Sequence, residues 1–117
     1  GWFDARVVRY SVRVNGLTGL AVTKLDVLDT FNEIPVGTDY MLDGKTCEEL
    51  PSDVRTLERV KPVYETLPGW RKPTTGARRM ADLPPEARAY LDRLEDLSGA
   101  PIRYVSVGTR RDQIIEV

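Results

Sequence analysis

The sequence predicts an α/β fold, and three observations lead to that prediction. Residues 20–24 form a short apolar segment with the pattern of a buried strand. Residues 84–98 have the apolar periodicity of a helix, with helix-starting prolines before it and a glycine after it. Residues 101–107 again have the pattern of a strand. Strands that alternate with helices are typical of α/β proteins.

The composition is that of an ordinary globular domain. The 117 residues fit one domain with a modest core, and 41% of them are hydrophobic and 30% charged. Seventeen basic and eighteen acidic residues leave a net charge of −1, so no overall field attracts nucleic acid or an anionic membrane. No apolar run reaches the ~18 residues of a membrane helix. We therefore expect no nucleic-acid partner and no membrane segment.

Missing residue types exclude several kinds of site. The chain has no histidine, which excludes imidazole-based catalysis and ordinary zinc sites. It has no glycine-rich phosphate loop of the G-x-x-x-x-G-K-S/T kind. Cys47 is the single cysteine and cannot form an internal disulfide, which suits a reducing cytoplasm. We assign no catalytic and no metal-binding residue to this chain. Because it begins at Gly1 without Met, we expect a piece of a longer protein.

Residues 4–15 fit two different structures. Asp4 is a good N-cap and Gly16 a good C-terminal stop for a helix. Apolar residues also alternate with polar ones in this segment, which is the pattern of a half-buried strand. The alternating residues are Val8, Tyr10, Val12 and Val14. The local pattern leaves the choice open.

The middle of the chain predicts two strands and a hairpin. Residues 32–40 have strand character, although a proline and a glycine within them weaken the pattern. Asp43-Gly44 is typical of a two-residue hairpin turn. Residues 51–60 are charged, and we expect a loop with a short helical turn. Residues 63–66 have the pattern of another strand.

The last third predicts a loop, a helix and two strands. Residues 70–83 are rich in Pro, Thr and Gly and predict a long surface loop. The helix that follows begins at Pro84-Pro85 and ends at Ser98-Gly99. Its apolar stripe consists of Leu83, Ala87, Ala89, Tyr90, Leu91, Leu94 and Leu97. After the strand at 101–107, Ile114-Ile115 begins another strand.

Lys24 and Asp26 stand two residues apart at the expected end of the first strand. Guanine presents a ring N–H beside an exocyclic amine, and one carboxylate accepts hydrogen bonds from both. A lysine beside it can lay its methylene stem along the purine face and hold its ammonium near the ribose. Alone, such a pair is more often a lysine and an aspartate that solvate the exit of a buried strand.

Four segments, in this order and spacing, closely resemble the C-terminal part of the adenylosuccinate synthetase family. They are residues 1–4 (GWFD), 15–29 (NGLTGLAVTKLDVLD), 62–70 (PVYETLPGW) and 106–113 (SVGTRRDQ). The resemblance extends over essentially the whole chain but only over the last part of such an enzyme. It implies that residues 1–117 are the C-terminal portion of a mostly parallel sheet, similar to that of P-loop nucleoside triphosphatases, with flanking helices and a small hairpin. It also favours the helix over residues 4–15.

The resemblance implies a guanine-binding site made from two segments. One follows the first strand, and the other is the loop after the strand at 101–107, which would close over the base. The site residues would be Lys24, Leu25, Asp26, Ser106, Val107 and Gly108. Gly108 would let the backbone approach the base edge. Thr109 stands where many family members carry a proline. This difference bears on the expected shape of the loop but not on the expected site.

The family joins IMP and L-aspartate with GTP hydrolysis in AMP biosynthesis. The resemblance therefore implies GTP, IMP and L-aspartate as ligands, Mg²⁺ as the metal, a homodimer and a cytoplasmic location. The family's catalytic residues, phosphate loop and magnesium ligand lie upstream of Gly1. We expect residues 1–117 to supply guanine recognition and to be inactive alone. The alternative is a non-catalytic interaction domain that keeps the fold without binding nucleotide.

Overall fold

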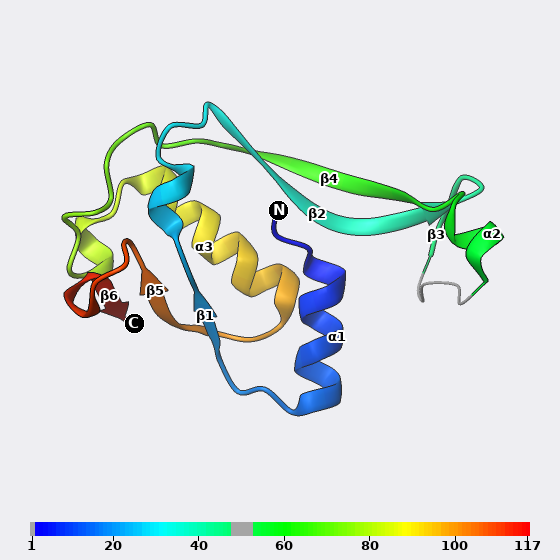
Figure 1. The fold of residues 1–117 in the computed structure, drawn as a ribbon, viewed down its shortest axis with the longest axis horizontal. Helices are drawn as coiled ribbons and strands as arrows, with labels where there is room; N and C mark the ends of the chain where they lie inside the picture. The colour runs from blue at the N-terminus through cyan, green and yellow to red at the C-terminus, as the bar shows by residue number, and fades with distance from the viewer. Residues whose placement is uncertain (1, 48–52) are drawn as a thin grey trace.

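A computed structural model describes residues 2–47 and 53–117 (Figure 1). Strands and helices alternate along these ranges, which confirms the α/β class. The elements are α1 (Ala5–Asn15), β1 (Leu20–Val22), the 3₁₀ turn η1 (Leu25–Leu28), β2 (Glu33–Leu42), β3 (Lys45–Thr46), α2 (Val54–Leu57), β4 (Lys61–Pro68), the 3₁₀ turn η2 (Met80–Asp82), α3 (Pro85–Ser98), β5 (Ile102–Ser106), the 3₁₀ turn η3 (Arg111–Gln113) and β6 (Ile114–Glu116). The short helical turn predicted within residues 51–60 is α2, whereas residues 51 and 52 lie outside the described ranges.

The strands form two sheets, a mixed one with the order β1-β5-β6 and an antiparallel one with the order β3-β2-β4. β1 and β5 pair in parallel, whereas β5 with β6, β2 with β3 and β2 with β4 pair antiparallel. The expected predominance of parallel strands is therefore not confirmed for the described residues. The short links from β2 to β3 and from β5 to β6 explain the difference, because parallel neighbours need a crossover of a dozen or more residues.

Capping residues determine the structure of residues 4–15, which form helix α1. The Asp4 carboxylate accepts hydrogen bonds from the backbone N–H groups of Arg6 (3.0 Å) and Val7 (3.2 Å), as an N-cap does. Gly16 ends the helix in the left-handed conformation, with φ at 62°. The helix favoured by the family resemblance is confirmed.

The alternating apolar residues of α1 are divided between two faces of the helix. Val8 and Val12 are half-buried, whereas Tyr10 and Val14 are exposed. Each pair is four residues apart, so its members share one face. The apparent period of two therefore arises from two interleaved helical pairs, and the strand pattern was misleading.

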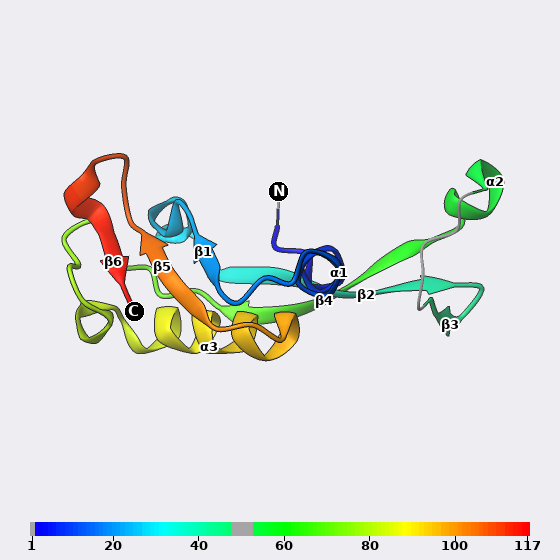
Figure 2. The ribbon, with the colours of Figure 1, turned by 90° about the horizontal axis from the view of Figure 1, so that it is seen from below.

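β2 and β4 form a long two-stranded ribbon that leaves the rest of the molecule (Figures 1 and 2). β3 and α2 lie at its far end. The predicted hairpin turn is present, and Asp43 and Gly44 both have positive φ, at 52° and 82°, as a type I′ turn requires. Because the ribbon projects, the radius of gyration of 15.6 Å exceeds the about 13 Å expected for a compact domain of this length.

The core lies between α3 and the strands. The apolar stripe of α3 is largely buried, and it packs in one cluster with Val105 of β5 and Ile115 of β6. Leu25 of η1 and Val107, which follows β5, belong to the same cluster and are 1% and 0% exposed. Each of the two predicted base-binding segments is therefore anchored in the core by an apolar residue, which limits its freedom to move.

Candidate purine-base site

The parallel pairing of β1 with β5 brings the two predicted segments together. Val22, the last residue of β1, is in register with Val105 near the end of β5. The carboxyl ends of the two strands therefore meet at one edge, where α/β proteins place their ligands. Lys24, Leu25 and Asp26 follow β1, the loop at 106–108 begins with the last residue of β5, and β5 also contacts η1.

Lys24 has an uncommon backbone conformation, with φ at 58° and ψ at 42°. A non-glycine residue in the left-handed region costs free energy, and such residues concentrate at binding sites. Here the conformation turns the chain from β1 into the 3₁₀ turn η1, with Lys24 exposed and Leu25 buried. The Lys24 ammonium is therefore free to reach a ligand while its neighbour fixes the backbone.

Asp26 carries the most informative atom of this edge. The residue as a whole is half-buried, but its Oδ1 is shielded from solvent and accepts no hydrogen bond within the described part of the chain. No other side-chain oxygen or nitrogen of the described residues is in this state. An unpaired buried carboxylate oxygen is costly, and it calls for a donor that the described residues do not supply.

The loop after β5 is held by its own hydrogen bonds. The Ser106 hydroxyl donates to the Gly108 carbonyl (2.8 Å), and the Val107 N–H donates to the Gln113 carbonyl (2.8 Å). A Cβ on Gly108 would overlap the Gln113 side-chain amide. The glycine therefore makes room for Gln113. Within the described residues, the Gly108 N–H donates no hydrogen bond.

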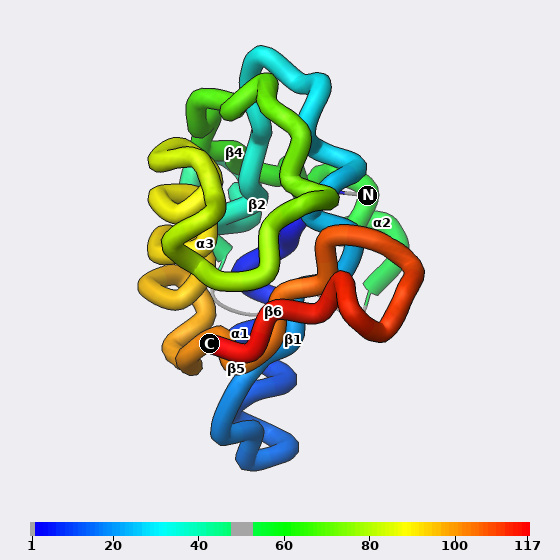
Figure 3. Tube along the Cα trace, turned by 90° about the vertical axis from the view of Figure 1, so that its left-hand side faces the viewer, coloured from blue at the N-terminus to red at the C-terminus, as the bar shows by residue number. Residues whose placement is uncertain are grey.

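Asp29 is a key residue of this edge that the sequence did not reveal. Its carboxylate accepts hydrogen bonds from Trp70 Nε1 (2.7 Å), the Thr74 N–H (2.8 Å) and Thr74 Oγ (2.8 Å). The donors lie 41 and 45 residues away, so no local spacing predicts the contact. Figure 3 shows the segment between β4 and α3 crossing this end of the molecule. Trp70 and Thr74 are buried, so the predicted surface loop is partly a core element.

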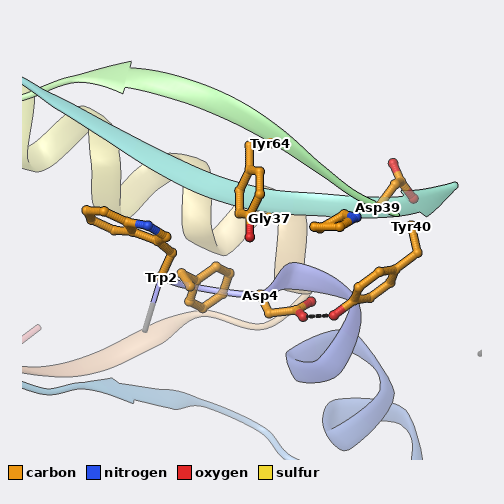
Figure 4. A pocket seen from close by; sticks show the side chains of 8 residues that line it. Trp2, Asp4, Gly37, Asp39, Tyr40 and Tyr64 are labelled. Carbon is orange, nitrogen blue, oxygen red and sulfur yellow. Dashed lines mark hydrogen bonds between the residues drawn. The ribbon is translucent and has the colours of Figure 1, made fainter. Parts of the chain in front are cut away.

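A separate cavity of about 80 Å³ lies between the start of α1 and the β2–β4 ribbon (Figure 4). Its walls are Trp2, Phe3, Asp4, Gly37, Asp39, Tyr40, Pro62 and Tyr64. A cavity of about 150 Å³ holds one benzene molecule, so this smaller space does not hold a purine. It is therefore not an alternative base site.

Tyr40 in this cavity donates a hydrogen bond to the Asp4 carboxylate (Figure 4). That bond, followed by burial, raises the pKa of Tyr40 from 10.0 to about 12. Because the pKa of this acid is raised on folding, its stabilising contribution is complete below about pH 10 and is lost as the pH rises through about 12.

We therefore expect Tyr40→Phe to reduce the amount by which the free energy of unfolding falls at alkaline pH. The measurement is the free energy of unfolding in urea at about pH 9 and about pH 11, for the wild-type chain and the variant. The wild type should lose more stability between the two conditions. An equal loss in both proteins would contradict the assignment of the shift to the Tyr40–Asp4 bond.

Two further searches bear on what the chain binds. Among residues 2–47 and 53–117, no group of three or more histidine, cysteine, aspartate or glutamate residues is placed to hold a metal ion. Over the same ranges, no helix has the length and apolar character needed to cross a membrane.

The fold and the two loops define an α/β domain in which a shielded carboxylate oxygen lies at the carboxyl ends of parallel strands and has no hydrogen-bond donor among residues 2–47 and 53–117. The family model described as adenylosuccinate synthetase matches residues 1–115 of the chain. The chain belongs to the adenylosuccinate synthetase family.

Individual relatives agree with this assignment. The adenylosuccinate synthetase of Pelobacter propionicus is 58% identical over 115 residues, which are 98% of this chain and 27% of that relative. Adenylosuccinate synthetase 1, chloroplastic, of Ricinus communis is 52% identical over 98% of this chain and 26% of its own length. The structure of fully ligated adenylosuccinate synthetase from Plasmodium falciparum matches with a TM-score of 0.93 at 27% identity, over 100% of this chain and 28% of that one. The chain thus spans about a quarter of the length of these proteins.

Proposed function

We propose that residues 1–117 are the guanine-recognition portion of an adenylosuccinate synthetase, the GTP-dependent ligase that joins IMP and L-aspartate to give adenylosuccinate. The observation that carries the proposal is the Asp26 Oδ1 atom, which is shielded and accepts no hydrogen bond within the described residues. It stands in one of two segments that meet at the carboxyl ends of β1 and β5. Family membership is consistent with a nucleotide there.

Asp26 would accept hydrogen bonds from the guanine ring N–H and the exocyclic amine. A carboxylate suits this pair of adjacent donors because it offers two acceptor oxygens and a negative charge. Side chains that now shield Oδ1 would have to move aside when the base arrives, and pairing with the base would then remove the cost of the unpaired oxygen. Adenine lacks both donors at the corresponding positions, so ATP is not expected to replace GTP.

The remaining site residues would complete the pocket around the base. The exposed Lys24 would lay its stem along the purine face and hold its ammonium near the ribose, and buried Leu25 would fix the turn beneath it. From the loop after β5, the Gly108 N–H would donate to the guanine carbonyl oxygen, because it donates no hydrogen bond within the described residues. Ser106 and Val107 would hold this loop in shape through their hydrogen bonds to Gly108 and Gln113.

Other functions belong to the rest of the enzyme in this proposal. Among the described residues, no group of three or more histidine, cysteine, aspartate or glutamate residues is placed to hold Mg²⁺. The remainder would bind IMP, L-aspartate and the GTP phosphates and would supply the catalytic groups. β1 and β5 would continue into a larger, mostly parallel sheet there. We also propose a cytoplasmic homodimer for the complete enzyme.

The test uses a full-length chimera in which this chain replaces the matching segment of the Pelobacter propionicus relative. We expect the purified chimera to form adenylosuccinate from IMP and L-aspartate with GTP and not with ATP. The measurement is the initial rate with each nucleotide at equal concentration. A folded chimera that is inactive, or that uses ATP as well as GTP, would contradict the proposal.

A further inference from the structure

A segment distant in sequence connects the two base-site loops. We call residues 70–79 the strap. At one end of the strap, Trp70 and Thr74 donate their hydrogen bonds to Asp29, the residue that directly follows η1. Trp70 is 3% exposed and Thr74 is 1% exposed, so these charge-assisted bonds are shielded from water. Trp70 also packs on Tyr90 of α3, with ring centroids 5.6 Å apart.

The other end of the strap contacts the segment that supports the second loop. Gln113 Nε2 donates to the Thr75 carbonyl (3.5 Å), and Arg78 forms an ion pair with Asp112 (3.5 Å). The same Gln113 accepts the Val107 N–H through its carbonyl and places its amide beside Gly108. The strap is therefore bonded at one end to Asp29, which follows η1 and the first base-site loop. At its other end it is bonded to Gln113, which contacts the loop at 106–108.

The strap adds hydrogen bonds and an ion pair to the apolar contacts of Leu25 and Val107, which already anchor the two loops in the core. β1 has only three residues, and its pairing with β5 is irregular between Leu20 and Ala21. η1 is a single 3₁₀ turn, which has poor hydrogen-bond geometry of its own. Recognition of a base from two sides needs both sets of groups at a fixed distance.

We propose that Asp29 is a positioning residue for guanine recognition, because it anchors the strap that sets the distance between the two base-site loops. This inference rests on the proposed function and adds to it a residue that does not touch the base. Loss of the anchor would let one loop shift relative to the other. The contacts made jointly by both loops would then weaken more than contacts made by one.

The test compares GTP with ITP in the chimera described above. ITP lacks the exocyclic amine, so the ratio of kcat/KM for GTP to that for ITP reports how accurately Asp26 meets the base edge. Asp29→Asn replaces the carboxylate with an amide, whose NH₂ group cannot accept the hydrogen bonds that Trp70 and Thr74 donate. We expect it to raise the KM for GTP about tenfold and to lower the GTP/ITP ratio about fivefold, with kcat and the KM for IMP within about twofold of the wild type.

Two variants of Thr74 test the same contact by a milder change. Thr74→Val keeps the side-chain shape and removes the hydroxyl donor, so it should also lower the GTP/ITP ratio. Thr74→Ser keeps the hydroxyl and should restore the wild-type ratio. These variants decide the question if Asp29→Asn does not fold.

Glu65→Gln is the matched control. Glu65 forms a two-bond ion pair with Arg93 (2.6 and 3.1 Å), which joins β4 to α3 away from the strap contacts. Like Asp29→Asn, it converts a bonded carboxylate to an amide. It should leave the GTP/ITP ratio unchanged, because a loss of folded enzyme lowers the rate with both nucleotides equally.

Asp26→Asn, measured in parallel, separates the two proposals. If it changes the GTP/ITP ratio while Asp29→Asn and Thr74→Val do not, the strap does not position the site and this inference is overturned. If Asp26→Asn leaves the ratio unchanged, the base binds elsewhere, and the proposed function and this inference both fail.

Discussion

Asp26→Asn in the full-length chimera is expected to lower kcat/KM for GTP by about 100-fold, because it removes one hydrogen bond and the negative charge that strengthens the other. The Asn amide would point its NH₂ group at the exocyclic amine of guanine, so that two donors face each other. In xanthine that amine is replaced by a carbonyl oxygen, which accepts from the Asn NH₂. The same variant should therefore gain activity with XTP.

The measurement is kcat/KM for GTP and XTP at saturating IMP and L-aspartate. Asp92→Asn on the exposed side of α3 is the matched control, because it makes the same chemical change away from the base-site loops. It should retain the wild-type preference. If Asp26→Asn keeps full use of GTP and gains nothing with XTP, Asp26 does not contact the base.

The strand ends that carry the candidate site could be predicted from the sequence, because they depend on local patterns. The structure has both strands, β1 ending at Val22 just before Lys24 and β5 ending at Ser106. The parallel pairing of β1 and β5 then places the following residues at one edge. The set of six site residues comes from the family resemblance and not from a local pattern.

Asp29 shows what local patterns cannot reveal. One carboxylate beside an apolar segment has many possible roles, and only the fold brings Trp70 and Thr74 to it. The segment at 70–83 differs from the predicted surface loop for a related reason. Its Pro, Thr and Gly content indicates irregular backbone correctly, but irregular backbone becomes buried where a partner such as Asp29 satisfies its donors.

The glycine within β2 was similarly ambiguous. Gly37 weakened the strand prediction, yet β2 runs through it as part of a ten-residue strand. The structure explains the residue, because the Gly37 N–H donates to the Phe3 carbonyl (2.7 Å) and a Cβ would lie 3.3 Å from that oxygen. A glycine in a strand thus marked the close approach of another backbone segment, in this case the one that leads into α1.

Gly69→Ala is expected to destabilise the chain by about 3 kcal/mol, at the upper end of the range for overpacked sites. A Cβ at this position would overlap the Phe31 carbonyl oxygen and lie 2.8 Å from the Phe31 carbonyl carbon. These are backbone atoms, so no side-chain rotation relieves the contact. The Gly69 N–H also donates to the Asn32 carbonyl (2.8 Å), and that bond would be strained as the two segments separate.

Gly76→Ala is the control for this prediction, because it makes the same chemical change within the strap where a Cβ meets nothing within 4 Å. The free energy of unfolding of both variants should be measured in urea, with unchanged or slightly increased stability expected for Gly76→Ala. Since Trp70 follows Gly69 and donates to Asp29, Gly69→Ala in the chimera should also lower the GTP/ITP ratio. Equal stability of the two variants would show that residues 31–32 and 69 do not approach each other as described.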